Sequence, residues 1–198
     1  MSEQVIRPGR YFIVAFFLIL VVIGADQASK WFVMESMLRV KSENPDFWTW
    51  FTTRDMVEFF TDQQEKYQQV VFNPWLNFTM VWNKGISFGM FGAGQGKTPL
   101  LFIALSMMIS FGLLIWLVLA RTKMLFFALP LIIGGAIGNV IDRVRFGAVA
   151  DFIDVHMADR HWPAFNIADA CVCIGAFFLI LDTIFDKSGS KKKGTKNA

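Results

Sequence analysis

Two carboxylates in this sequence, Asp151 and Asp169, could act together on one substrate bond. They lie 18 positions apart in the sequence, which is enough for the chain to turn back and bring the two together. Two adjacent carboxylates cannot both ionise cheaply, so such a pair holds a shared proton. One member can then deprotonate a water while the other protonates a carbonyl oxygen, which hydrolyses an amide without a metal or a covalent intermediate. The residues alone leave an ion or proton relay as a competing interpretation.

Amides and further charges accompany this pair. Asn139, Asp142 and Arg143 have the i, i+3, i+4 spacing that places them on one face of an expected helix. Asn166 precedes Asp169 by three residues at the start of the next apolar run. Charged groups inside a membrane span cost about 2.5–3.5 kcal/mol each, so polar residues there indicate function. An ordinary interfacial ion pair between Asp142 and Arg143 is the alternative for those two residues.

Four hydrophobic segments are expected to position these residues, which predicts an all-α integral membrane protein. The 198 residues are 55% hydrophobic and 18% charged, and residues 1–198 suit a single domain. A bilayer core needs about 20 apolar residues in a helix. The expected transmembrane helices are about 11–32, 98–120, 124–142 and 164–185.

The first of these segments has a second interpretation. Basic residues precede an apolar core and Ala25, which is also the pattern of a cleavable signal peptide. A retained helix is favoured, because its continuation through Trp31 completes a span. It also places Asp26 and Lys30 one turn apart near the outer end of that helix.

The distribution of basic residues predicts that both termini are cytoplasmic. Residues 1–10, 121–123 and 186–198 hold nine of the 19 Lys and Arg, although they make up only a small part of the chain. Cytoplasmic segments carry such an excess of positive charge. Residues 33–97 and 143–163 are then extracytoplasmic, and 186–198 form a cytoplasmic tail.

The outer segments differ in composition. Residues 33–73 are polar and aromatic, and they are expected to form helical or irregular structure on the membrane surface as a long outer insertion. Residues 72–92 alternate and contain many β-formers, which predicts short strands and turns in a small extracytoplasmic β-structured platform. Residues 143–163 are expected to be a connection in which Asp154 and Asp159 are solvated loop acids.

Other chemistries find little support in the residues. His156 and His161 lack the spacing and further ligands of a metal site, so no metal and no cofactor are expected. Cys171 and Cys173 point to different faces of a helix and are expected to be buried, inert thiols. Residues 92–96 (GAGQG) lack the rest of a phosphate-binding loop. No basic patch interleaved with aromatic residues is present, so no nucleic acid partner is expected.

Five short blocks, in this order, resemble lipoprotein signal peptidase, also called signal peptidase II, a family of four-span aspartic peptidases. The blocks are Asp26–Lys30 (DQASK), Asn83–Phe88 (NKGISF), Gly134–Arg143 (GGAIGNVIDR), Val149–Asp154 (VADFID) and Phe165–Asp169 (FNIAD). Together they span most of the chain. One departure is clear, because the segment of about 40 residues before Phe72 is longer than the resemblance leads us to expect.

The resemblance implies that Asp151 and Asp169 are the catalytic dyad. It implies a support or substrate-binding role for Asp26, Lys30, Asn83, Gly85, Asn139, Asp142, Arg143 and Asn166. The implied substrate is a prolipoprotein whose cysteine carries diacylglycerol, cut just before that cysteine at the outer side of the bacterial cytoplasmic (inner) membrane. Membrane lipid is the other expected partner, and the chain is expected to be a monomer.

Three other functions fit the sequence less well. A small ion- or proton-coupled transporter predicts inverted repeats and acids near the bilayer midplane, and the sequence contains no internal repeat. A non-enzymatic membrane adaptor does not account for two acids with asparagine companions. A lipid phosphatase lacks its Arg and His phosphate signatures.

Overall fold

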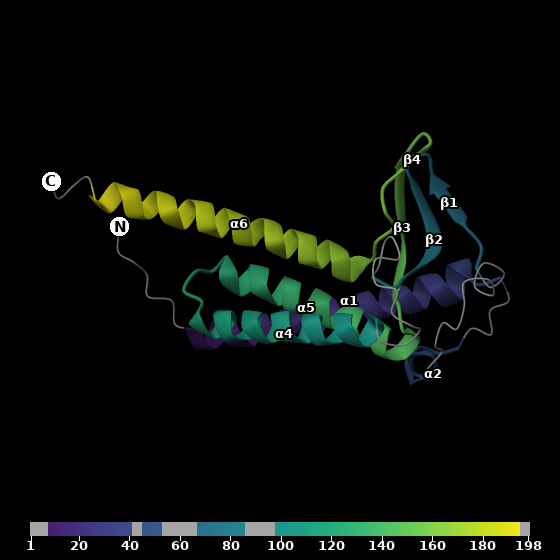
Figure 1. The fold of residues 1–198 in the computed structure, drawn as a ribbon, viewed down its shortest axis with the longest axis horizontal. Coiled ribbons are helices and arrows are strands. Elements are labelled where there is room, and N and C mark those ends of the chain that lie inside the picture. Colours follow the sequence, from purple (N-terminus) through teal and green to yellow (C-terminus); the bar gives the residue numbers. More distant parts are fainter. Residues whose placement is uncertain (1–7, 41–44, 53–66, 86–97, 195–198) are drawn as a thin grey trace.

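Four helices run along the long axis of the molecule (Figure 1). This computed structural model describes residues 8–40, 45–52, 67–85 and 98–194. Four helices in these ranges are long and apolar enough to cross a membrane, namely Gly9–Leu38, Pro99–Leu119, Leu125–Phe146 and Ile167–Phe185. They belong to α1 (Pro8–Trp31) with its π-helical continuation η1 (Phe32–Leu38), α4 (Thr98–Leu119), α5 (Leu125–Phe146) and α6 (Ile167–Gly194). The expectation of four apolar helices with a small β-structure is confirmed.

Helix α5 is the central helix, because it contacts α1, α4 and α6. Small residues on α5 allow this close packing. A Cβ atom added to Gly134 would lie 2.8 Å from the Cβ of Val22 on α1. The helix continues to Phe146, a turn beyond the expected end at 142. It stops at Gly147, whose left-handed φ of 74° forms a typical C-cap.

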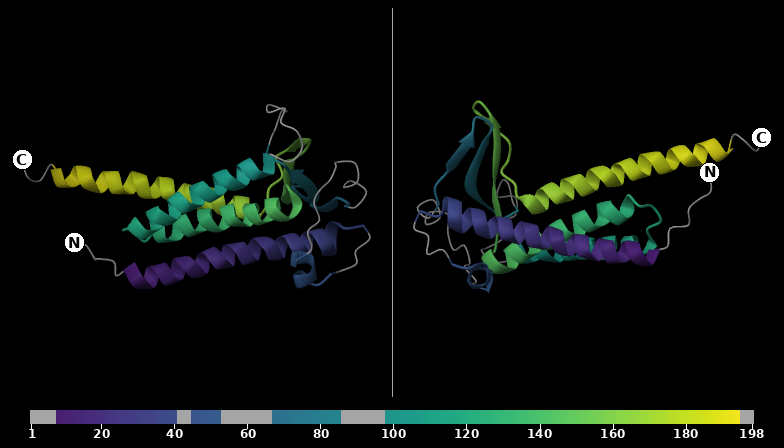
Figure 2. Two further views of the ribbon diagram at one scale, coloured as in Figure 1. Left: turned by 60° about the horizontal axis from the view of Figure 1, so that its bottom comes forward. Right: turned by 180° about the vertical axis from the view of Figure 1, so that it is seen from behind.

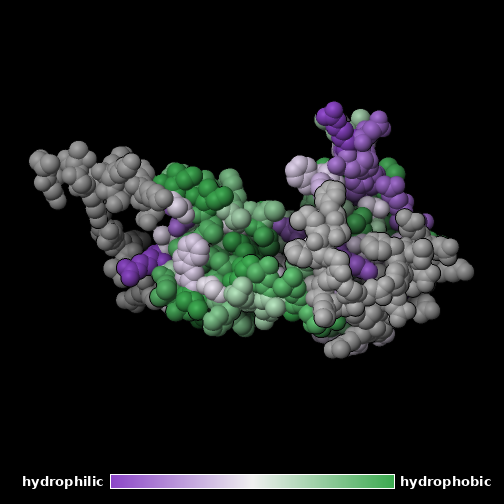
Figure 3. Space-filling view, viewed as in Figure 1, coloured by the Kyte–Doolittle hydropathy of each residue, from purple (hydrophilic) through white to green (hydrophobic). Residues whose placement is uncertain are grey.

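The outward-facing side chains of the other helices are apolar. Large exposed examples are Phe16 on α1, Met108 on α4 and Phe177 on α6. Figure 3 shows hydrophobic surface over the helices and hydrophilic residues over the tip of the sheet near β4. The same lipid-facing side of α6 exposes Cys173, and Cys171 is only partly buried, so the prediction that both thiols are buried is wrong. A bilayer would cover this surface.

A four-stranded antiparallel sheet lies at one end of the helices and runs across their direction (Figures 1 and 2). Its strands, in spatial order, are β1 (Val70–Asn73), β2 (Leu76–Asn83), β3 (Val149–Met157) and β4 (Arg160–His161). The central pair joins segments on either side of α4 and α5 in the sequence, and Val81 opposes Asp151. The fold therefore brings the end of β2 to the first residues of β3.

The sheet is larger than the sequence predicted. Alternation predicted strands only within 72–92, whereas 149–161 provide two of the four strands. Most of β3 is buried, so it lacks the alternation of a half-exposed strand. The prediction that Asp154 is a solvated loop acid is wrong, because it is buried and accepts a hydrogen bond from Asn77 Nδ2 at 3.1 Å. Asp159 is exposed in the turn after β3, as expected.

The described parts of the segment between η1 and β1 are bonded to α1 and to η1. Trp31 Nε1 donates to the carbonyl oxygen of Pro45 at 2.9 Å, just before α2 (Phe47–Thr52). At the other end, Gln68 N donates to Leu38 O at 2.7 Å. The parts of the predicted insertion at 41–44 and 53–66 lie outside the described residues, as do residues 86–92 of the predicted strand region.

Candidate active site

The two acids lie where β3 and α6 begin. Asp151 is the third residue of β3, and Asp169 is in the first turn of α6. Asn166 caps that helix, because its Oδ1 accepts from Asp169 N at 2.9 Å while Asp169 Oδ2 accepts from Asn166 N at 3.3 Å. This reciprocal pair is a capping box, which accounts for the three-residue spacing of Asn166 and Asp169.

Two asparagine amides connect the two carboxylates. Asn166 Nδ2 donates to Asp151 Oδ1 at 2.7 Å and to Asn139 Oδ1 at 3.2 Å. Asn139 Nδ2 in turn donates to Asp169 Oδ1 at 2.8 Å. The structure thus joins residues from α5, β3 and α6 in one chain of hydrogen bonds with an acid at each end. Four of the residues singled out in the sequence meet here.

A third amide holds the other oxygen of Asp151. Asn83 Nδ2 at the end of β2 donates to Asp151 Oδ2 at 3.0 Å, and Asn83 Oδ1 accepts from Gly85 N at 2.8 Å. Gly85 has a φ of 82°, which a residue with a Cβ rarely adopts. The ring of Phe102 on α4 occupies the space where such a Cβ would lie. Residues 86–88 of the same sequence block lie outside the described residues.

The surroundings of Asp151 favour its protonated form. The side chain is 1% exposed. Burial, followed by the negative charge of Asp169, raises the pKa of Asp151 to about 7, against the opposing effect of the hydrogen bonds from Asn83 and Asn166. Asp169 is partly exposed and lies at a helix N-terminus, where the peptide dipoles favour a negative charge. One acid is therefore suited to donate a proton and the other to accept one.

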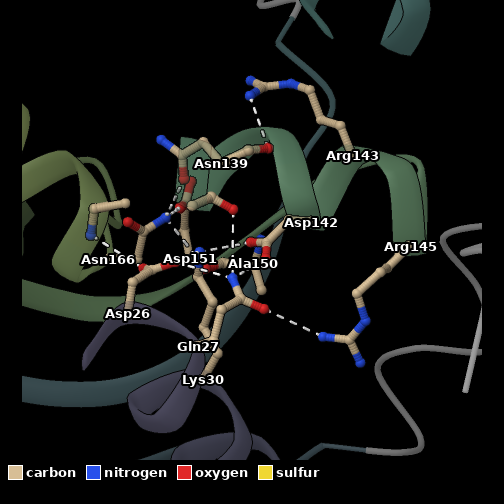
Figure 4. A network of polar contacts seen from close by, with 12 residues as sticks. Asp26, Gln27, Lys30, Asn139, Asp142, Arg143, Arg145, Ala150, Asp151 and Asn166 are labelled. Carbon is tan, nitrogen blue, oxygen red and sulfur yellow. Dashed lines mark hydrogen bonds and ion pairs between the residues drawn. The ribbon is translucent and has the colours of Figure 1, made fainter. Parts of the chain in front are cut away.

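A buried ion cluster lies next to Asp151, as Figure 4 shows. Lys30 Nζ lies 2.7 Å from Asp26 Oδ2 and 2.7 Å from Asp142 Oδ2, and all three side chains are fully buried. Gln27 Nε2 donates to Asp26 Oδ2 and to Asp142 Oδ1, each at 3.0 Å. Asp142 therefore has Lys30 as its ion-pair partner, and the alternative of an Asp142–Arg143 pair is wrong.

Each carboxylate of this cluster also holds a backbone amide beside one of the two acids. Asp142 Oδ2 accepts from Ala150 N at 3.1 Å, and Asp26 Oδ1 accepts from Ala168 N at 3.1 Å. Ala150 directly precedes Asp151, and Ala168 directly precedes Asp169. One lysine thus orients two carboxylates, and each carboxylate fixes the backbone next to a different acid.

The two arginines at the end of α5 point in different directions (Figure 4). Arg143 Nη1 donates to Asn139 O at 3.3 Å, and its guanidinium lies 5.4 Å from the ring centre of Phe102. Arg145 is buried and donates through Nη1 to Gln27 Oε1 at 3.3 Å. Sequence reasoning gave no role to Gln27 or Arg145. Their polar character at the ends of apolar segments was the available signal.

Metal ligands do not gather in the described part of the chain. No group of three or more His, Cys, Asp or Glu side chains there could hold a metal ion. His156 and His161 stack with ring centres 4.9 Å apart, and His161 Nδ1 lies 2.8 Å from Asp154 Oδ1. The arrangement at Asp151 and Asp169 is instead suited to moving protons between two carboxyl groups and a small molecule between them.

The sequence and the fold of this chain are both similar to those of known proteins. The family model of signal peptidase (SPase) II matches residues 18–185. The lipoprotein signal peptidase of Coxiella burnetii is 38% identical over 165 residues, which cover 77% of this chain and 98% of that protein. That of Methylobacterium radiotolerans is 43% identical over 111 residues, covering 56% of this chain and 65% of the relative. A solved bacterial membrane enzyme is 25% identical with a TM-score of 0.58, covering 96% of this chain and 95% of its own. The chain therefore belongs to the signal peptidase II family of aspartic peptidases.

Proposed function

We propose that this enzyme cleaves lipoprotein precursors with Asp151 and Asp169 as its two catalytic residues. The observation that carries the proposal is the hydrogen-bonded chain Asp151–Asn166–Asn139–Asp169. It holds two acids in one site, and the pKa of Asp151 is raised to about 7 by burial and by the charge of Asp169. At neutral pH such a pair carries a single proton, as amide hydrolysis by two carboxyl groups requires.

In the first step, a water molecule between the acids attacks the carbonyl carbon of the scissile amide. Ionised Asp169 takes a proton from this water, and protonated Asp151 gives its proton to the carbonyl oxygen. The product is a neutral tetrahedral diol, with the proton of the pair now on Asp169. No charge is left on the carbonyl oxygen, which lowers the barrier in a site of low polarity.

In the second step, the diol breaks down. Asp169 returns its proton to the amide nitrogen while the C–N bond breaks, and one hydroxyl of the diol gives a proton to Asp151. The new carboxylic acid and the new amine leave, and the pair is again singly protonated. Each acid thus changes role between the two steps, and no covalent enzyme intermediate forms.

The other residues implied by the resemblance would orient the two acids or bind the substrate. Asn83, Asn139 and Asn166 orient the two carboxyl groups, and Gly85 orients Asn83 through its N–H. Asp26, Lys30 and Asp142 fix the backbone beside each acid. Within the described residues, Arg143 donates a hydrogen bond to Asn139 O and to neither acid, and its guanidinium is available to bind a substrate carbonyl group.

The proposed substrate carries a diacylglyceryl group on its cysteine and is cut just before this residue. The site lies at the sheet end of four lipid-facing helices, so the acyl chains and the signal helix of the substrate could remain in the bilayer during cleavage. The excess of basic residues at the opposite end supports an orientation with both termini in the cytoplasm and the sheet outside. We further propose that the enzyme works as a monomer in the inner membrane. The transporter alternative is set aside, because the chain belongs to a peptidase family.

The test compares three precursor peptides with purified enzyme in detergent: diacylglyceryl-modified, unmodified, and with the cysteine replaced by serine. We expect cleavage of the modified peptide alone, with a new N-terminal lipidated cysteine identified by mass spectrometry. Asp151→Asn should abolish the product, and Asp159→Asn, which changes an exposed acid in the turn after β3, should not. Equal cleavage of all three peptides would contradict the proposed substrate, and an active Asp151→Asn enzyme would contradict the proposed mechanism.

A further inference from the structure

The short helix α2 docks against the end of α5 through one buried arginine. Asp46 starts this helix, because its Oδ1 accepts from Trp48 N at 2.9 Å and from Thr49 N at 3.1 Å. Trp50 in the middle of α2 is buried and packs near Phe146, with ring centres 6.1 Å apart. The helix is therefore seated on the protein and does not lie free at the surface.

Arg145 makes the polar part of this docking. Its Nη2 donates to the carbonyl oxygen of Trp50 at 2.5 Å. Its guanidinium lies 3.9 Å from the ring centre of Trp50, 5.1 Å from that of Phe51 and 4.4 Å from that of Phe146. A buried guanidinium is retained only where hydrogen bonds and aromatic faces replace its water. The residues of α2 supply much of that replacement.

The same guanidinium reaches the ion cluster beside the acids. Arg145 Nη1 donates to Gln27 Oε1 at 3.3 Å, so the amide oxygen of Gln27 faces Arg145. The amide nitrogen then faces the other way and donates to Asp26 Oδ2 and Asp142 Oδ1, each at 3.0 Å. The nitrogen is thus held by two carboxylates and the oxygen by Arg145, so loss of Arg145 would free one end of the Gln27 amide to shift.

The orientation of Gln27 matters because of what the two carboxylates hold. Asp26 accepts from Ala168 N, and Asp142 accepts from Ala150 N, so each restrains the residue before Asp169 or Asp151. A shifted Gln27 amide would weaken its hydrogen bonds to these two carboxylates and loosen their hold on the backbone. Small misplacements of catalytic groups caused by remote changes can cost as much as about 100-fold in rate.

We propose that α2 and Arg145 form a positioning device for the Asp151–Asp169 pair, which acts by fixing the amide of Gln27. Helix α2 therefore supports the active site indirectly, through Arg145 on α5 and Gln27 on α1. This inference rests on the proposed function, because the pair it positions is the proposed catalytic pair. Arg145 itself touches neither acid in the described contacts and is a positioning residue.

The test measures cleavage and hydrogen exchange on the full-length protein in detergent. Arg145→Met keeps an unbranched side chain of similar length but removes both hydrogen bonds, and we expect kcat to fall about tenfold with KM changed less than about twofold. Backbone amides in peptides covering residues 147–152 and 166–170 should exchange faster, since Ala150 N and Ala168 N lose fixed acceptors. Arg160→Met, which changes an exposed arginine on β4, is the matched control and should leave both readouts at parent values.

A second variant covers the case in which Arg145→Met does not fold. Trp50→Leu leaves Arg145, its bond to Gln27 and the accepting carbonyl oxygen in place but removes the closest aromatic face, so we expect a loss of about twofold to threefold in kcat. Parent-like kcat and exchange in both variants, beside an inactive Asp151→Asn enzyme, would overturn the inference and leave the proposed function intact. Faster exchange in Arg145→Met together with full activity of Asp151→Asn would instead contradict the proposed function while supporting the docking of α2.

Discussion

The first residues of β3 and the first turn of α6 each present one acid, but they hold it in different ways. Asp151 extends from a buried strand and accepts from the side-chain amides of Asn83 and Asn166. Asp169 extends from a helix N-terminus and accepts from the backbone of its own cap as well as from one side-chain amide, that of Asn139. The strand therefore surrounds its acid with protein, whereas the helix offers its acid a favourable dipole and partial exposure.

This difference separates the roles of two chemically identical groups. Burial and the charge of Asp169 favour a neutral carboxyl group at Asp151, whose pKa is raised to about 7, while Asp169 lies partly exposed at a helix N-terminus. The groups that hold Asp151 (the strand support) and those that hold Asp169 (the helix support) are alike in one respect. In each support, the backbone amide just before the acid is bound to a carboxylate that pairs with Lys30. The predictions below first disrupt what the two supports share and then distinguish them.

The largest effect is expected from removing either acid. Asp151→Asn and Asp169→Asn should each lower kcat/KM by about 10² or more, since each removes a positioned acid–base group. The double variant should be hardly worse than either single one, because residues that act as a unit are strongly non-additive. Cleavage assays on folded protein, checked by thermal unfolding, would measure this. If the losses of the two single variants multiplied in the double variant, the acids would not act as a pair.

Lys30→Met should damage both supports at once. It leaves Asp26 and Asp142 buried without their shared cation, and breaking a buried ion pair in this way typically costs about 3–5 kcal/mol. Thermal unfolding in detergent should show a large decrease in Tm, and amides at both Ala150 and Ala168 should exchange faster. Faster exchange at one of them alone would mean that the supports do not share the lysine.

Gly138→Ala should disturb mainly the helix support. A Cβ at this position would lie 2.6 Å from Asp26 Oδ2, so Asp26 must shift and weaken its bond to Ala168 N, whereas Asp142 is not among the three atoms nearest to that Cβ. We expect a loss of about tenfold in kcat, with faster exchange at Ala168 and little change at Ala150. Gly112→Ala on α4 is the control, because a Cβ there would meet nothing within 4 Å.

Much of this arrangement could be predicted from sequence, and the reason is the environment. Lipid makes polar side chains in a span costly, so Asp26, Lys30, Asn139 and Asp142 stand out from the residues around them. Their four-residue spacing also predicts that Asp26 and Lys30 lie one helical turn apart, and in the structure Lys30 Nζ lies 2.7 Å from Asp26 Oδ2. Such local signals do not depend on how distant segments meet.

The contacts that depend on distant segments could not be predicted. Nothing in residues 149–157 indicated that β3 pairs with β2, because a buried strand lacks the alternation that marks a half-exposed one. The partner of Asp142 was also ambiguous, since the adjacent Arg143 and the distant Lys30 were both available cations. Arg145 and Trp50 are 95 residues apart, and no spacing rule relates them.

The pH dependence of cleavage should depend on the groups that hold Asp151. Because Asp151 must carry the proton, activity should fall as pH rises through the apparent pKa of the pair, which lies near 7. The hydrogen bond from Asn83 lowers the pKa of Asp151, so Asn83→Ala should move this alkaline limb to higher pH with a loss of a few-fold in kcat. Asn77→Ala is the control on the same strand, because Asn77 donates to Asp154 instead. If the alkaline limb of the pH–activity profile did not move in Asn83→Ala, Asp151 would not be the group that supplies the proton.

The smallest effect is expected three residues further along β3, at Asp154. Burial tends to raise the pKa of this carboxyl group, but hydrogen bonds from His161 and Asn77 outweigh it, and the pKa lies below its ordinary value. A lowered pKa stabilises the fold above the pKa of the unfolded chain, and this contribution disappears as pH falls through the folded value. Asp154→Asn should therefore cost about 0.5–1 kcal/mol of unfolding free energy at pH 7, a small value because the partner His161 is half exposed, and the difference should disappear as pH falls through the pKa of folded Asp154. Cleavage should stay within about twofold of the parent, since Asp154 lies on the opposite face of the strand from Asp151. A loss near that of Asp151→Asn would mean that the whole strand, and not its first residues alone, holds the acid in place.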